Sequence, residues 1–151
     1  MIHIQVDKEY WSVVKSTTLR QAAKAAYSVC GLPKDSEFTI VITGDQQVRA
    51  LNADYLKVND TTDVLSFPAD EKDPETGKGY LGDIIISYPR ATQQAAGAGH
   101  TTGDELSLLV IHGVLHLAGH DHAEVDEERI MFALQNDALN RLNLSIKGFN
   151  A

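Results

Sequence analysis

Four of the six histidines of this 151-residue chain fall within the short segment 112–122. His112 and His116 are four residues apart, so a helix would place both imidazoles on one face, one turn from each other. Gly119 has no Cβ and can therefore end such a helix in the left-handed conformation and turn the chain back. His122 follows three residues later and can meet the same ion from the side. The spacing predicts one zinc ion with His112, His116 and His122 as ligands.

The residues around these histidines are strongly apolar, so without a metal each imidazole would be a polar ring with no partner. Burying an unpartnered polar group costs about 1–3 kcal/mol in proteins, and one ion satisfies three rings at once. His120 stands between the glycine turn and Asp121. We expect His120 to be a solvated loop residue outside the coordination sphere.

Three protein ligands leave a fourth coordination position for water, which distinguishes a catalytic zinc from a structural one. A bound zinc ion lowers the pKa of that water to about 7 and can polarise a phosphoryl oxygen. His112, His116 and His122 are therefore predicted to be catalytic through the metal. Asp121 has two interpretations: an acceptor that orients a ligand imidazole, or a turn residue that caps its own backbone.

The strands that surround this segment are predicted from apolar alternation and β-branched runs. Pro68 is expected to close the third strand, and residues 70–79 are expected to form an exposed loop because they are charged and contain proline and glycine. The last strand is mostly apolar and is expected inside the sheet. The four predicted strands are Ile2–Val6, Phe38–Thr43, Val64–Phe67 and Gly82–Ser87.

Helices are predicted from apolar residues at steps of three and four together with start and stop signals. The first runs from Asp7, as N-cap, through Trp11 to Val29. A capping box, Thr102-x-x-Glu105, begins the histidine helix. The others are a short helix capped by Asp45, a helix from Pro89 to about Ala98, and a last helix with an acidic start and the apolar stripe Met131, Leu134, Ala138 and Leu142.

Length predicts one domain over residues 1–151. The predicted strands and helices indicate an α+β fold with a small four-stranded mixed sheet and about five helices, and the histidine spacing indicates a zincin-like metal helix. Apolar residues make up 43% and charged residues 23%, as in ordinary globular proteins. No apolar run approaches the length of a membrane span, about 20 residues, and a single cysteine, Cys30, fits a reducing cytosol. The net charge of −8 argues against indiscriminate nucleic-acid binding but allows a local basic patch.

Three motifs resemble those of the YbeY family of bacterial ribosomal-RNA maturation factors. H-G-x-L-H-L-x-G-x-D-H stands unbroken from His112 to His122, T-D-V-L-S-F-P runs from Thr62 to Pro68, and Gly82-Asp-Ile begins the strand before the metal helix. The resemblance implies a single-strand-specific endoribonuclease with one zinc ion. It further implies a role in maturing the 3′ end of small-subunit 16S ribosomal RNA and in ribosome quality control.

The resemblance also implies a cytoplasmic protein, with no membrane association, whose partners are single-stranded ribosomal RNA, the small ribosomal subunit and its assembly factors. Many family members carry an arginine after the tyrosine that is Tyr55 here, whereas this chain has Leu56 followed by Lys57. Lys57 offers a point charge without the guanidinium fork, so it is either a substitute RNA contact, together with Arg49, or an ordinary solvated lysine. Ser66 either lines the cleft or faces solvent.

Two alternative functions stay open from the residues alone. The ligand spacing is also that of the metzincin proteases, but those enzymes need a general base next to the first histidine, worth about 10²–10⁴-fold in rate. Gly113 occupies that position here and counts against a metalloprotease. The other alternative is a non-enzymatic ribosome-assembly factor with a structural zinc, in which His120 or Asp121 closes the coordination sphere.

Overall fold

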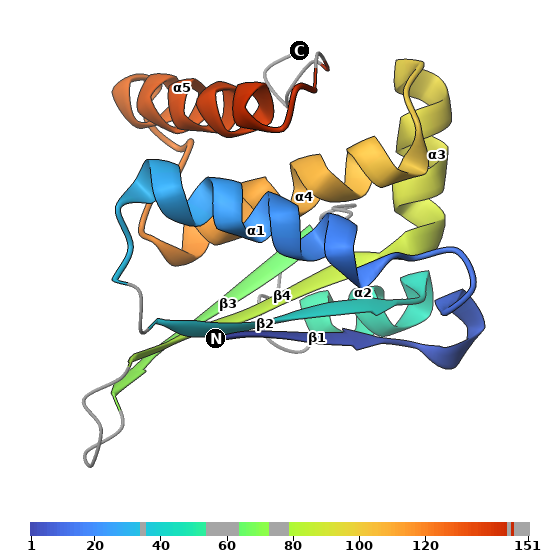
Figure 1. Ribbon diagram of the computed structural model, residues 1–151. Helices are drawn as coiled ribbons and strands as arrows, with labels where there is room; N and C mark the ends of the chain where they lie inside the picture. Colours follow the sequence, from blue (N-terminus) through green and yellow to red (C-terminus); the bar gives the residue numbers. More distant parts are fainter. Residues whose placement is uncertain (34–35, 54–63, 73–78, 145, 147–151) are drawn as a thin grey trace.

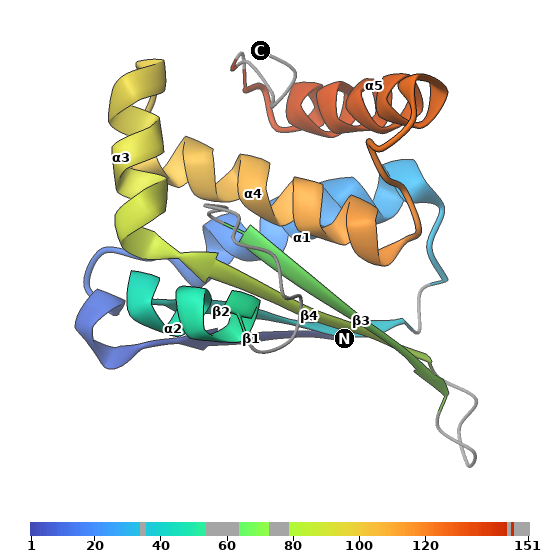
Figure 2. The same ribbon diagram turned by 180° about the vertical axis from the view of Figure 1, so that it is seen from behind.

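The computed structural model of the chain describes residues 1–33, 36–53, 64–72, 79–144 and 146. Within these residues it contains a four-stranded sheet, five α-helices and one 3₁₀ turn, which confirms the predicted α+β class with a small mixed sheet and about five helices. Helices lie in two tiers above one face of the sheet, and a short helix lies on the opposite face (Figures 1 and 2).

The sheet has the strand order β1-β2-β4-β3. The first three of these are parallel to one another, and β3 is antiparallel to β4 at the edge. The apolar strand β4 therefore lies inside the sheet, as its sequence predicted. The strand bounds are β1 Ile2–Val6, β2 Glu37–Thr43, β3 Val64–Lys72 and β4 Gly79–Ser87.

The edge strand β3 is longer than predicted. The expected stop at Pro68 and the expected start of the loop at Asp70 were wrong, because β3 continues to Lys72 and β4 begins at Gly79 rather than Gly82. The rest of the predicted loop, residues 73–78, lies outside the described residues. The register shifts between Pro68 and Glu71. An edge strand with such an irregularity tolerates proline, which lacks an N–H for the ladder.

The first helix is shorter than predicted. Residues Lys8–Tyr10 form the 3₁₀ turn η1, and the α-helix begins only at Ser16. Asp7 accepts a hydrogen bond from Thr43 Oγ1 at 2.6 Å instead of capping a helix. Trp11 is 64% exposed, and its indole N–H donates to the carbonyl of Val6 at 2.7 Å. These contacts tie the segment before α1 to the ends of β1 and β2. The helix bounds are α1 Ser16–Cys30, α2 Asp45–Leu51, α3 Tyr88–Ala98, α4 Thr102–Leu117 and α5 Val125–Arg141.

Two predicted helix caps are displaced by one residue. Thr101, rather than Thr102, caps α4, since its side chain accepts from the backbone N–H of Asp104 at 3.1 Å. Glu105, the expected partner in the capping box, is buried with its Oε1 2.7 Å from His100 Nε2. Gly44 is the N-cap of α2, so Asp45 is its first helical residue.

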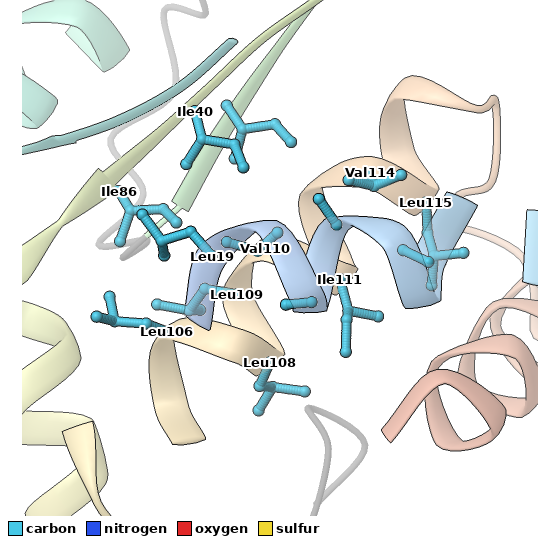
Figure 3. Packing of buried hydrophobic residues seen from close by; sticks show 14 of the residues in the cluster. Leu19, Ile40, Ile86, Leu106, Leu108, Leu109, Val110, Ile111, Val114 and Leu115 are labelled. Carbon is cyan, nitrogen blue, oxygen red and sulfur yellow. The ribbon is translucent and has the colours of Figure 1, made fainter. Parts of the chain in front are cut away.

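Helices α1 and α4 lie side by side on the sheet, and α5 packs over both (Figures 1 and 2). Every residue of α4 from Glu105 to Leu115 is buried, as expected for a helix that is apolar on all sides. Figure 3 shows its side chains gathered with residues of α1 and the sheet, among them Leu19, Ile40, Ile86, Leu106, Leu109, Val110, Ile111 and Leu115. Helix α4 is thus the centre of the core.

The two faces of the sheet differ in the number of hydrophobic side chains that are buried against them. On the face opposite α4, Val48 of α2 packs in a smaller cluster with Leu65 and Ile85. The large cluster on the α4 face therefore fixes the position of the histidine helix. Among the described residues, none of the helices combines the length and apolar character needed to cross a membrane.

Candidate metal centre

His112 and His116 lie on the last two turns of α4, and His122 lies in the segment that follows it. One ring nitrogen of each histidine lies within 4.8 Å of the others. The Nε2 atoms of His112 and His116 are 3.1 Å apart. The structure therefore brings together the three residues that the sequence singled out, at the end of the most buried helix.

The turn that carries His122 is built by backbone hydrogen bonds. The N–H of Gly119 donates to His116 O, and the N–H of His120 donates to Leu115 O, both at 3.0 Å. Gly119 has φ +100°, a conformation that an L-residue adopts only with strain, so glycine ends the helix here as predicted. Asp121 Oδ1 accepts the backbone N–H of His122 at 2.7 Å. This contact fixes the turn and corresponds to the capping interpretation of Asp121.

Exposure increases along the three rings: His112 is buried at 6% exposed, His116 is half-buried and His122 is exposed. Burial, and then the proximity of the His116 imidazole, lowers the pKa of His112 to about 4. Burial, and then the proximity of His122, also lowers the pKa of His116. Both helical imidazoles are therefore neutral at pH 7, the state in which a histidine can bind a metal.

The geometry of the cluster fits a metal ion with nitrogen ligands. Zn–N bonds of about 2.0–2.1 Å in a tetrahedral sphere hold two ligand nitrogens roughly 3.3 Å apart. The 3.1 Å between His112 Nε2 and His116 Nε2 is close to this value without any rearrangement of α4. Three imidazoles suit zinc, and they also suit copper, nickel or iron.

Sequence reasoning missed one residue of this site, Gln135 of α5. Its Oε1 lies 3.1 Å from His112 Nδ1, and its side chain is fully buried. The signal was present in the sequence, because Gln135 interrupts the apolar stripe of the last helix between Met131 and Ala138. A polar residue on the buried face of a helix requires a partner.

Gly113, the residue where metzincins carry their glutamate, faces the sheet. A Cβ built on Gly113 would stand 2.7 Å from Cγ2 of Ile84, which is fully buried. Glycine is therefore required for α4 to lie this close to β4. A carboxylate at this position would meet the core and not a metal-bound water.

Of the remaining predicted residues, Ser66 lies beside this centre, Arg49 lies on α2 at the opposite face of the sheet, and Lys57 lies outside the described part. Ser66 faces α4 rather than solvent, and its hydroxyl donates to the carbonyl of Gly113 at 3.4 Å. Arg49 pairs with Asp45, with 3.0 Å between Nε and Oδ2. His120 is half-buried and is not one of the three grouped ligands. Lys57, with its neighbours Tyr55 and Leu56, lies outside the described residues.

Comparison with known proteins shows which family the chain resembles. A family model described as "Endoribonuclease YbeY" matches residues 3–143. Among curated relatives, a protein named Endoribonuclease YbeY from Clavibacter sepedonicus is 39% identical, covering 96% of this chain and 98% of the relative. One of the same name from Geobacillus thermodenitrificans is 40% identical, covering 85% and 86%. The solution structure of TM1509 from Thermotoga maritima has a similar fold, with TM-score 0.58, 22% identity, and 95% and 92% of the two chains covered.

Proposed function

This chain belongs to the YbeY endoribonuclease family, and we propose that it is a zinc-dependent endoribonuclease specific for single-stranded RNA. It is a hydrolase that acts on RNA. The observation that carries the zinc proposal is the cluster of His112, His116 and His122 within the matched residues. We further propose that the cleavage matures the 3′ end of 16S ribosomal RNA and serves ribosome quality control, in the cytoplasm, on the small ribosomal subunit with its assembly factors.

The catalytic domain is proposed to span residues 1–151, with the three histidines as its metal ligands. A zinc ion held there would supply a Lewis acid for a phosphate oxygen and a water that ionises near neutral pH. The protein contributes position and charge state. Helix α4 holds His112 and His116 one turn apart, and their lowered pKa values keep both rings neutral and ready to bind. The exposed side of His122 leaves the cluster open to a long substrate.

RNA is proposed to be held by a small number of phosphate contacts, from Lys57 and Arg49, with Ser66 beside the metal helix. The net charge of −8 supports few contacts rather than many. The pairing of Arg49 with Asp45 moderates the charge that Arg49 offers. Because each phosphate contact to a single strand contributes a slope of about −0.7 to log K against log salt, we expect a gentle salt dependence of RNA affinity.

The function is tested by incubating the protein with labelled single-stranded RNA and, separately, with casein, each with and without a chelator. Chelator-sensitive cleavage of RNA alone supports the proposal. Cleavage of casein would identify a protease, which the packing of Gly113 on Ile84 disfavours. Cleavage of neither, by protein shown to contain metal, would indicate an assembly factor with a structural ion.

The nucleophile is proposed to be water rather than the 2′-hydroxyl of RNA. The 2′-hydroxyl route requires a base for that hydroxyl and an acid for the leaving oxygen. The position that holds a carboxylate in metzincins is Gly113, which faces the core. A substrate with one 2′-deoxy nucleotide at the cleavage position should therefore still be cut. Loss of cleavage with unchanged binding, and a normal product ending in a 2′,3′-cyclic phosphate, would contradict this.

A further inference from the structure

Gln135 is an unusual core residue. Its side chain is 0% exposed, and its Nε2 has no hydrogen-bond partner within the part of the chain that the structure describes. Leaving a buried donor unpaired costs free energy, and leucine would fill a similar volume without that cost. The side-chain oxygen is the part of Gln135 with a partner, and that partner is Nδ1 of His112, 3.1 Å away.

This contact determines which nitrogen of His112 carries the proton. A neutral imidazole has one N–H and one lone pair, and the hydrogen bond at one nitrogen sets the state of the other. Because the amide oxygen of Gln135 only accepts, His112 donates from Nδ1 and keeps a lone pair on Nε2. Nε2 is the atom that faces His116 across 3.1 Å, inside the cluster. The contact therefore prepares the nitrogen that a metal needs.

We propose that Gln135 is a positioning residue of the metal centre, which holds His112 in the Nδ1–H tautomer and directs its Nε2 lone pair at the ion. The inference rests on the metal site of the proposed function and is independent of the RNA chemistry. It makes α5, which packs over α4 (Figure 1), a structural part of the centre although Gln135 is 23 residues from His112. A neutral amide also leaves the full charge of the ion available to a phosphate, whereas a carboxylate would offset part of it.

The unchanged, metal-free protein provides the first test. Long-range ¹H–¹⁵N NMR spectra of the histidine rings at neutral pH distinguish the two tautomers, and His112 should be protonated on Nδ1. Predominance of the Nε2–H tautomer would overturn the inference. This measurement requires no variant, so it stands even if a substitution at Gln135 prevents folding.

The second test measures zinc affinity at fixed pH by competition with a chromophoric chelator. Gln135→Leu removes the acceptor and should weaken zinc binding about 10–100-fold, the usual effect of losing an outer hydrogen-bond partner. Gln135→Glu keeps an oxygen and should bind zinc at least as tightly as the unchanged protein. Leu139→Ala is the matched control, since Leu139 lies one turn further along α5 and is 2% exposed. It should melt earlier and bind zinc normally.

The outcomes separate this inference from the proposed function. Unchanged affinity in Gln135→Leu would overturn the positioning role while leaving the zinc site in place. Equal losses in Gln135→Leu, Gln135→Glu and Leu139→Ala would show that Gln135 only fills the core. Absence of zinc binding by the unchanged protein would refute the metal centre and this inference with it.

Discussion

His112 and His122 reach the same point of the molecule from two different kinds of structure. His112 is part of a helix buried on all sides, with its outer nitrogen hydrogen-bonded to Gln135. His122 is exposed and lies in a turn that is held by backbone hydrogen bonds and by the side chain of Asp121. The His112 ring is positioned by the core around α4, and the His122 ring by the short turn that follows this helix.

The buried side of the site, at His112, and the exposed side, at His122, therefore differ in how much freedom each ring retains. A ring fixed by packing has lost its conformational freedom on folding, so binding an ion costs it little further entropy. A ring on an exposed turn is ordered less strongly and gains more order from the ion. The buried side thus fixes the position of His112, while His122 lies open to solvent.

The largest effect should come from removing a helical ligand. His116→Ala should empty the site, because two remaining imidazoles on different elements bind weakly, whereas His120→Ala should leave it filled. Elemental analysis of both purified variants measures the metal content per chain. Equal metal loss in the two variants would show that His120 is a ligand and that the turn, rather than the helix, dominates the site.

Removal of the metal from the unchanged protein should affect the turn that carries His122 more than helix α4. An ion at about a thousand times its dissociation constant stabilises the folded state by about 4 kcal/mol, so chelation should lower the melting temperature. In hydrogen exchange, amides of residues 119–122 should lose protection first, and those of α4 should stay protected until global unfolding. Simultaneous loss in both segments would remove the proposed distinction.

Acid should lower the stability of the metal-free protein through the buried residue His112. In the metal-free protein, burial lowers the pKa of His112 from 6.5 to about 4. The unfolded chain therefore binds this proton more readily, so stability is full above pH 6.5 and falls as the pH drops towards 4. The loss amounts to roughly 3 kcal/mol. Urea unfolding at several pH values measures it, and His112→Gln should flatten the curve. Parallel curves for the two proteins would contradict the assignment to His112.

A smaller effect is expected where α4 rests on the sheet. Gly113→Ala places a Cβ 2.7 Å from Ile84 Cγ2, and such overpacking costs about 1–3 kcal/mol. The higher helix propensity of alanine offsets part of this, about 1 kcal/mol. Gly97→Ala is the matched control, because Gly97 lies on α3 with nothing within 4 Å of its added Cβ. It should be stabilising. A rise in unfolding free energy for both variants would show that α4 can move away from β4.

The grouping of the three histidines was predictable from the sequence because the information is local. His112 and His116 lie one turn apart on one apolar helix and Gly119 follows its end, so their spacing needs no knowledge of the rest of the fold. The predictions that failed depend on distant contacts. The first helix begins late because Asp7 bonds to Thr43, 36 residues away. Likewise, Pro68 stays within a strand because β3 is at the sheet edge, which only the assembled topology shows.

The contact between Gly113 and Ile84 also restricts which side chains residue 113 can carry. A change from this site towards a zincin protease needs a glutamate at residue 113, but that side chain has no space until Ile84 becomes small. Ile84→Ala alone leaves a cavity in the core, at a cost of about 2–5 kcal/mol. Either single step passes through a destabilised protein before the pair is complete. Replacement of Gly113 by a larger residue therefore depends on a compensating change at Ile84.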